Sequence, residues 1–178
     1  MNETKGVFDK QILGIIENVR IYHRVFEKDK IVGKKESKEF VEIKAKIDTG
    51  AEYSSIDKNL AIELGYCDII DEFYKRTKGF IINSETENDA LNLRIKNELE
   101  KWGDSFNAKL IKSSHGASYR LMIAMDLVLA NVKIHTFFSV IDRGHMQFPV
   151  LIGRKSMKNF LVDPLKFSGE KYEKWEIL

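Results

Sequence analysis

The sequence predicts a mainly β domain, and three patterns support this fold class. Apolar and charged residues alternate from Phe40 to Asp48, which is typical of a strand with one exposed face. A second alternating stretch, Leu121 to Leu129, is followed by Ala130-Asn131 and then by VKIHTFFSVID, which indicates two antiparallel strands joined by a tight turn. The helical patterns are short by comparison, so we expect the helices to be accessory elements.

Length and composition favour one folded domain. The chain has 178 residues, of which 43% are hydrophobic and 31% charged, so a disordered chain is excluded. We expect a single domain over residues 12–168, with tails at 1–11 and 169–178. The formal net charge of +2 argues against non-specific nucleic-acid binding. A single cysteine fits a reducing compartment, and no stretch resembles a signal peptide or a membrane span, so a cytoplasmic protein without a membrane partner is expected.

The first half of the chain predicts two strands and two helices. The segment Ile12–Phe26 is rich in β-branched and aromatic residues and predicts a strand, followed by an exposed connection over Glu27–Glu39. After the strand that ends at Asp48, helical spacing predicts a short helix over Ser54–Tyr66, ended by Gly65. Asp89 can cap a second helix, whose apolar stripe is Leu91, Ile95, Leu99 and Trp102 and which ends at Gly103. The stretch between these helices has no clear pattern.

The second half predicts strands again from Phe106 onward. After the hairpin described above, Phe148–Ile152 is a continuous apolar run closed by Gly153, which is typical of a buried strand. Ser156–Asn159 can form one helical turn, and the segment FLVD predicts a last short strand.

The tripeptide Asp48-Thr49-Gly50 stands where an alternating strand ends. Its aspartate offers a carboxylate, its threonine a hydroxyl that can brace a tight turn, and its glycine lets another backbone approach closely. About a hundred residues later, Val150 to Arg154 supplies an apolar strand that ends in Gly-Arg. The tripeptide alone is also ordinary turn chemistry, but together with the second segment it points to catalysis.

In this combination the chain resembles the retropepsin-like aspartic peptidases. It is most similar to their small cellular branch labelled ATP-dependent zinc protease, which is found alongside ATP-grasp ligases that add glutamate to proteins. The resemblance rests on four segments in the family's order: ENVRI, IKAKIDTGAEYSSI, VIDRGHMQFPVLIGR and FLVDP. It covers about Gly14 to Pro164, and residues 66–103 form a divergent or inserted region.

The resemblance implies a retropepsin-like lobe, a closed β-barrel with short helices and a helical insertion, that pairs with a second copy. Asp48 of each copy would then be catalytic, with Thr49, Gly50 and Ala51 forming the active-site turn. Leu151, Ile152 and Gly153 would lie beside the site, and Glu52 and Arg154 would form a buried structural ion pair. The expected reaction is peptide-bond hydrolysis without a metal or organic cofactor. Acidic or glutamylated polypeptides are the expected substrates, and an ATP-grasp ligase is an expected partner.

Two other functions remain open from the sequence. The first is a non-catalytic dimerisation or peptide-binding module that keeps the same fold. The second is a metallopeptidase, since the chain has four histidines, but none of them stands at the close spacing that places metal ligands on one helical face.

Overall fold

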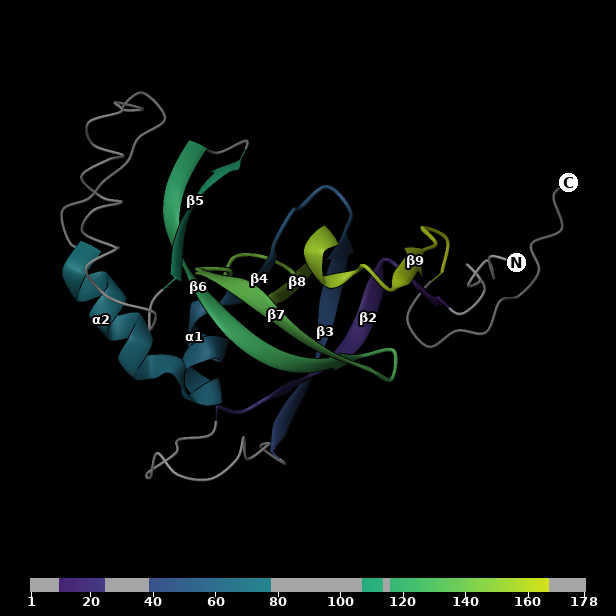
Figure 1. The fold of residues 1–178 in the computed structure, drawn as a ribbon, viewed down its shortest axis with the longest axis horizontal. Coiled ribbons are helices and arrows are strands. Elements are labelled where there is room, and N and C mark those ends of the chain that lie inside the picture. Colours follow the sequence, from purple (N-terminus) through teal and green to yellow (C-terminus); the bar gives the residue numbers. More distant parts are fainter. Residues whose placement is uncertain (1–9, 25–38, 78–106, 114–115, 167–178) are drawn as a thin grey trace, which may run out of the picture.

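The structure is a computed structural model that describes residues 10–24, 39–77, 107–113 and 116–166 (Figure 1). This described part is mainly β, as the sequence predicts. Its strands are β1 (Gln11–Leu13), β2 (Ile16–Tyr22), β3 (Phe40–Asp48), β4 (Ser54–Asp57), β5 (Asn107–Ser113), β6 (Gly116–Leu129), β7 (Val132–Ile141), β8 (Val150–Gly153) and β9 (Phe160–Val162). The helices are α1 (Lys58–Ala61) and α2 (Cys67–Thr77), with a π-type segment at Ile62–Tyr66 between them and a 3-10 turn at Arg154–Ser156.

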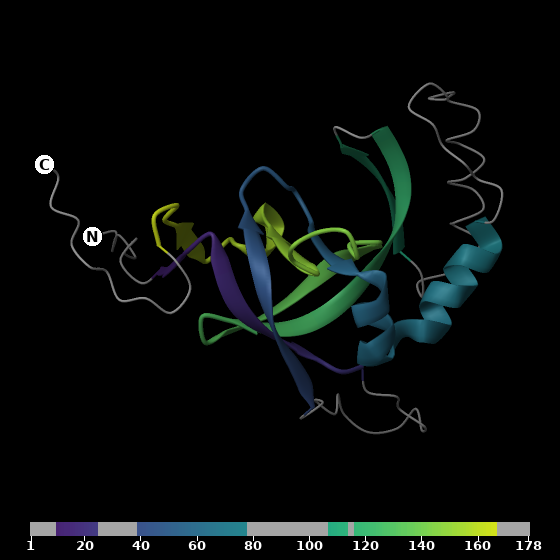
Figure 2. The same cartoon turned by 180° about the vertical axis from the view of Figure 1, so that it is seen from behind.

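One seven-stranded sheet, in the order β2-β3-β8-β4-β7-β6-β5, forms the body of the molecule. Strand β2 also pairs with β6 through three residue pairs, which brings two sides of the sheet together. Strand β5 lies outside this ring, so the closed barrel that the resemblance implies is realised only in part. Figures 1 and 2 both place the helices on one side of this sheet and the small β1–β9 pair on the other.

Two strand predictions are confirmed closely. Strand β3 has the bounds that the alternating pattern predicts, with Ala45 and Ile47 buried and their neighbours turned outward. The hairpin of β6 and β7 turns at Ala130 and Asn131, whose φ angles of 46° and 63° are both positive. Two successive left-handed residues match the right-handed twist of the flanking strands, which is why this short turn can join them.

The predicted strand over Ile12–Phe26 is divided into β1 and β2. The division falls at Gly14, where a Cβ atom would lie 2.1 Å from the carbonyl oxygen of Lys166. The two chain segments can approach this closely because glycine has no side chain there. Strand β1 therefore leaves the main sheet and pairs in parallel with β9.

The predicted helix over Ser54–Tyr66 is partly wrong, because its first four residues form β4. This strand lies between β7 and β8, and all four of its residues are buried. The helix begins one residue later, with the Asp57 carboxylate accepting hydrogen bonds from the Asn59 and Leu60 amides. Gly65 interrupts the helix in a left-handed conformation (φ 94°), as its predicted role as a stop requires, but α2 then continues where the sequence indicates no element.

The core lies inside the sheet and under the helices. Ile56, Phe138 and Ile152 are fully buried in it, and Leu64 and Ile70 add the apolar faces of the helical segments. The helix predicted after Asp89 lies outside the described residues. Within the described residues, no helix combines the length and the apolar character that crossing a bilayer would take.

Candidate active site

Asp48 is the last residue of β3 and begins the turn at the centre of the site. Its Oδ1 atom accepts hydrogen bonds from the backbone amides of Gly50, at 2.8 Å, and Ala51, at 3.1 Å. The carboxylate is half-buried and lines a cleft. The turn therefore holds one oxygen of Asp48 in place.

The C-terminal end of β8 fastens this turn, so the structure brings together the two motifs that lie a hundred residues apart. Strands β3 and β8 run parallel, with Asp48 opposite Gly153. Arg154 donates from Nη1 to the carbonyl oxygens of Thr49, at 2.7 Å, and Gly50, at 2.8 Å, and its own amide donates to Ala51. Arg154 thus braces the turn through its backbone carbonyls.

The expected buried ion pair between Glu52 and Arg154 is not formed in this structure. Glu52 instead pairs with Lys155, at 2.9 Å between Oε1 and Nζ, and both side chains are about half-exposed. The reason is geometric: the guanidinium of Arg154 is occupied by the carbonyls of Thr49 and Gly50, and Lys155 is the next residue along the 3-10 turn. The ion pair at this position is therefore a surface contact.

The contact with Lys155 makes Glu52 a pH-dependent element of the turn. Hydrogen bonds from Lys155 and from Tyr53 lower the pKa of Glu52 below its ordinary value of 4.5. Because the folded state favours the ionised form, this stabilisation is present above the ordinary pKa and is lost as the pH falls through the folded-state pKa.

Replacing Glu52 with Gln should therefore lower the melting temperature at pH 7 and have a smaller effect at about pH 3. Thermal unfolding of both proteins at the two pH values measures this difference. The matched control is the same replacement in a Lys155→Met background, where the effect at pH 7 should be much smaller. An equal effect of Glu52→Gln at both pH values would contradict the assignment.

Strand β8 places its predicted residues on two faces. Leu151 lines the cleft, whereas Ile152 points the other way and is fully buried in the core. Gly153 permits a close approach, because a Cβ atom there would lie 2.5 Å from the carbonyl carbon and oxygen of Tyr53. The Gly153 amide also donates to Ser54 Oγ, at 3.1 Å. The chain that leaves the turn therefore packs directly on the backbone of β8.

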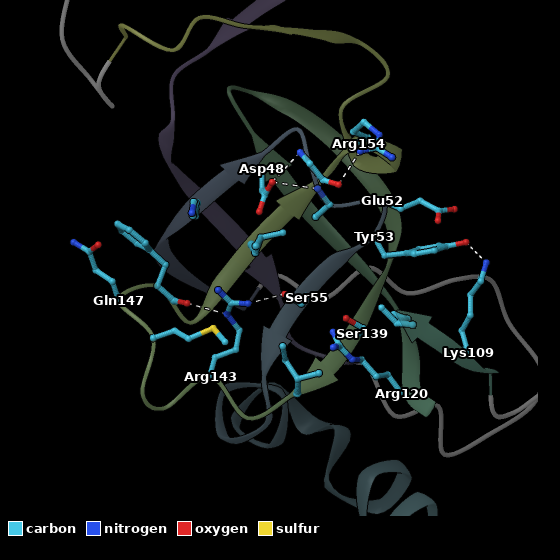
Figure 3. Close-up of a pocket in the computed structure, with 18 of the residues that line it drawn as sticks. Asp48, Glu52, Tyr53, Ser55, Lys109, Arg120, Ser139, Arg143, Gln147 and Arg154 are labelled. Carbon is cyan, nitrogen blue, oxygen red and sulfur yellow. Dashed lines mark hydrogen bonds between the residues drawn. The ribbon is translucent and has the colours of Figure 1, made fainter. Parts of the chain in front are cut away.

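The cleft beside Asp48 has a volume of about 1400 Å³, which exceeds the usual range of about 300–1,000 Å³ for small-molecule pockets. Its floor is one face of the sheet, since Lys46, Leu151, Ser55 and Ser139 are successive register partners on β3, β8, β4 and β7. Figure 3 shows Ser55 and Ser139 of this floor between Asp48 and Arg120 of β6. The size and the open shape suit an extended chain.

Positive charge dominates the cleft. Among its described lining residues, five are cationic and two acidic: Lys46, Lys109, Arg120, Arg143 and Arg154 against Asp48 and Glu52. Burial lowers the pKa of Arg120 and of Arg143, so both guanidinium groups have lost part of their hydration. An anionic ligand would restore favourable interactions to these groups, and the cleft therefore suits a negatively charged partner.

Tyr53 connects the turn to the β5–β6 hairpin at the edge of the cleft. Its Oη atom accepts a hydrogen bond from Lys109 of β5 and another, at 2.6 Å, from Lys155. Both ammonium groups also lie within 4.4 Å of the centre of the Tyr53 ring, in cation–π contact. These contacts fix the outer wall of the cleft relative to Asp48.

Sequence reasoning missed most of the cleft. It gave no chemical role to Arg143, Ser55, Ser139, Lys109 or Arg120. Lys109 and Arg120 are direct partners across β5 and β6, but the sequence of β5 does not show which residue it faces. The alternation of apolar and polar residues along each strand shows which residues of that strand share a face. It shows which residues of two strands share a face only once the pairing register is known.

None of the histidines in the described part of the chain, His23, His135 and His145, lines this cleft. His135 hydrogen-bonds Asp126 across β6 and β7, at 2.6 Å, and both side chains are exposed. Within the part of the chain that the structure describes, no three His, Cys, Asp or Glu side chains are placed so that they could hold a metal ion together.

A comparison with protein-family models identifies a matching family. A model of the RimB-like family, described as retropepsin-like aspartic endopeptidase RimB, matches residues 80–170. This region contains the Leu151–Arg154 segment and begins after Asp48. No curated protein matches the chain.

Solved structures similar to the chain include two proteins at low identity. The first is Lpg0085 from Legionella pneumophila subsp. pneumophila str. Philadelphia 1, a protein of unknown function (DUF785), with 12% identity over 89% of this chain and 97% of the other and a TM-score of 0.44. The second is the retroviral protease-like domain of Ddi1 from Leishmania major, with 18% identity over 64% of this chain and 63% of the other and a TM-score of 0.30. The family model, which matches just over half of the sequence, confirms the resemblance: the chain belongs to the RimB-like family of retropepsin-like aspartic endopeptidases.

Proposed function

We propose that the protein is an aspartic endopeptidase that acts as a homodimer, with one Asp48 from each subunit. The observation that carries this proposal is the position of Asp48, which is held by the amides of its own turn at the edge of a cleft of about 1400 Å³. Only one other carboxylate among the described residues lines this cleft, and that residue, Glu52, is engaged by Lys155. The second catalytic carboxylate is therefore expected from a second copy of the chain.

The chemistry follows from two carboxyl groups at close range. Two aspartates within about 3 Å cannot both ionise, so together they hold one proton. The ionised aspartate takes a proton from a water molecule, whose oxygen attacks the carbonyl carbon of the peptide bond, while the protonated aspartate donates to the carbonyl oxygen. The amine then leaves with a proton as the carbon–nitrogen bond breaks. The turn contributes by holding each Asp48 in a fixed orientation.

The cationic cleft supports acidic polypeptides as substrates. Five cationic lining residues favour a chain that carries carboxylate side chains, and glutamate-rich or glutamylated segments have this chemistry. A ligase that adds glutamate to proteins would supply such a substrate, which agrees with the expected ATP-grasp partner.

The purified chain should cleave an unfolded peptide of alternating Glu and Ala in preference to a matched peptide of Gln and Ala. The assay covers about pH 4 to 7, where the dyad can hold a single proton. We expect the preference to fall as salt rises from about 20 mM to 0.5 M, because exposed charges such as Lys46 and Lys109 are screened. Binding of both peptides without cleavage at any pH would contradict the proposal and favour the non-catalytic peptide-binding module.

A further inference from the structure

Arg143 is the most deeply buried cation of the cleft. It follows β7 in the loop that leads to β8, and only 6% of its surface is exposed. Its backbone amide donates to Oδ2 of Asp57, at 2.8 Å, and Oδ1 of the same carboxylate caps α1. The main chain at Arg143 is therefore fixed to the sheet and to the helix independently of its side chain.

Two further contacts fix the guanidinium. Its Nε donates to the carbonyl oxygen of Phe148, at 2.9 Å, and its Nη1 donates to Ser55 Oγ, also at 2.9 Å (Figure 3). Within the described residues, Nη2 has no hydrogen-bond partner. Every side-chain nitrogen or oxygen atom there that is inaccessible to solvent does have such a partner. Nη2 is therefore not sealed in the protein, and since Arg143 lines the cleft, this atom opens into it.

A guanidinium held in this way is prepared to bind a carboxylate. Its orientation is set before a ligand arrives, so little side-chain entropy is lost on binding. Burial has removed much of its hydration, and a charge-assisted hydrogen bond is worth more in such surroundings than at an exposed lysine. Lys46, which lines the same cleft, is exposed and lacks both advantages.

The sheet register gives the position of Arg143 relative to the reaction. Asp48 lies opposite Gly153 on β8, and Ser55, the partner of Arg143, lies opposite Leu151 on the same strand. Asp48 and Ser55 are thus two strand spacings and two residues apart, which corresponds to about 12 Å. An extended substrate covers this distance in about three to four residues.

We propose that Arg143 is a specificity-determining residue, whose guanidinium binds one carboxylate side chain of the substrate about three residues from the scissile bond. This inference rests on the proposed function and extends it by distinguishing two roles of the cationic side chains in the cleft. The exposed cations of the cleft attract an acidic chain without regard to register. Arg143 selects a carboxylate at one position.

The test uses ten-residue Ala/Gly peptides in which a single Glu, or Gln as the matched peptide, is moved through every position. We expect wild-type kcat/KM to favour Glu over Gln by about 10- to 100-fold at one position, including at 0.5 M salt. Arg143→Met should reduce this ratio to below about threefold, with kcat/KM for the Gln peptide of the same variant as the internal reference. Arg143→Lys keeps the charge but loses the fork, so it should restore the ratio only in part.

The control is Lys46→Met. This substitution should lower kcat/KM for all Glu peptides at low salt and leave the Glu-to-Gln ratio at each position at 0.5 M salt as in the wild type. Circular dichroism and thermal unfolding show whether each variant is folded. Ser55→Ala provides a second test, because it frees Nη1 without removing the guanidinium and should lower the ratio partially. The inference is overturned if folded Arg143→Met and Arg143→Lys keep the full ratio, or if the wild type cleaves these peptides with no position at which Glu is preferred.

A binding measurement separates this inference from the proposed function. The same peptide pairs are titrated into Asp48→Asn protein and into Asp48→Asn, Arg143→Met protein. A Glu preference that is present in the first and lost in the second supports the role of Arg143 even if the wild type cleaves nothing. Cleavage by the wild type with equal Glu preference in both binding experiments would instead support the peptidase and contradict the role of Arg143.

Discussion

Asp48→Asn protein should fold, dimerise and lose peptide cleavage by at least about 10²- to 10⁴-fold. Asparagine retains an Oδ1 atom that can accept from the Gly50 and Ala51 amides, so the turn should keep its shape. The amide cannot take a proton from water at neutral or mildly acidic pH, so the general base is lost. A peptide-cleavage assay together with thermal unfolding separates loss of chemistry from loss of structure.

Mixing the two proteins tests whether the site is shared between subunits. If subunits exchange and each site needs two Asp48 residues, an equal amount of Asp48→Asn protein should lower the activity of a fixed amount of wild type to about half, and a tenfold excess to about one tenth. A site complete within one chain would show no such inhibition. Unchanged activity in the mixture, with exchange shown by a labelled subunit, would therefore refute the shared dyad.

Gly153→Ala should destabilise the protein and displace the active-site turn. The new Cβ would lie 2.5 Å from backbone atoms of Tyr53, and a backbone cannot rotate away as a flexible side chain can. Strand β8 or the chain after the turn must shift, and we expect the free energy of unfolding to fall by about 1–3 kcal/mol. Urea denaturation measures this change, and peptide cleavage should fall with it because Arg154, the next residue, fastens the turn.

Gly50→Ala is the matched control in the same turn. Its Cβ would have a single near contact, 3.1 Å from Asp48 Oδ1, and this side chain can adjust by a few tenths of an ångström. Its effect on unfolding should therefore be smaller than that of Gly153→Ala. Equal destabilisation by the two substitutions would show that the close approach between β8 and Tyr53 is not what makes Gly153 necessary.

The elements that the sequence predicts correctly are those that local patterns determine. Strand β3 and the β6–β7 hairpin follow the predicted pattern because each strand alternates along its own length and the turn needs only two adjacent residues. The helical prediction for Ser54–Asp57 is wrong because Ile56 fits both a helical and an extended spacing. Its actual state depends on β7 and β8, which are far away in the sequence and flank it on both sides.

The ion pair of Glu52 shows the same limit within the site. The resemblance implies a partner for Glu52 at the end of β8. It implies Arg154 as that partner, whereas in the structure Glu52 pairs with Lys155. Adjacent residues on a 3-10 turn point in different directions, and their neighbours decide which one meets the carboxylate. Arg154 donates hydrogen bonds to two carbonyl oxygens of the turn, and Lys155 forms the ion pair with Glu52.

The sequence by itself determined the strand that carries Asp48, the position of that residue at the strand's end and the class of β-rich fold, because residue periodicity and turn chemistry are local properties of the chain. Only the tertiary structure decided that Lys46, Lys109, Arg120 and Arg143 line one cleft with Asp48. These residues come from strands and loops far apart in the sequence, and their meeting depends on strand order and register. Pairing between distant strands is set by packing of the whole sheet, which no short segment encodes.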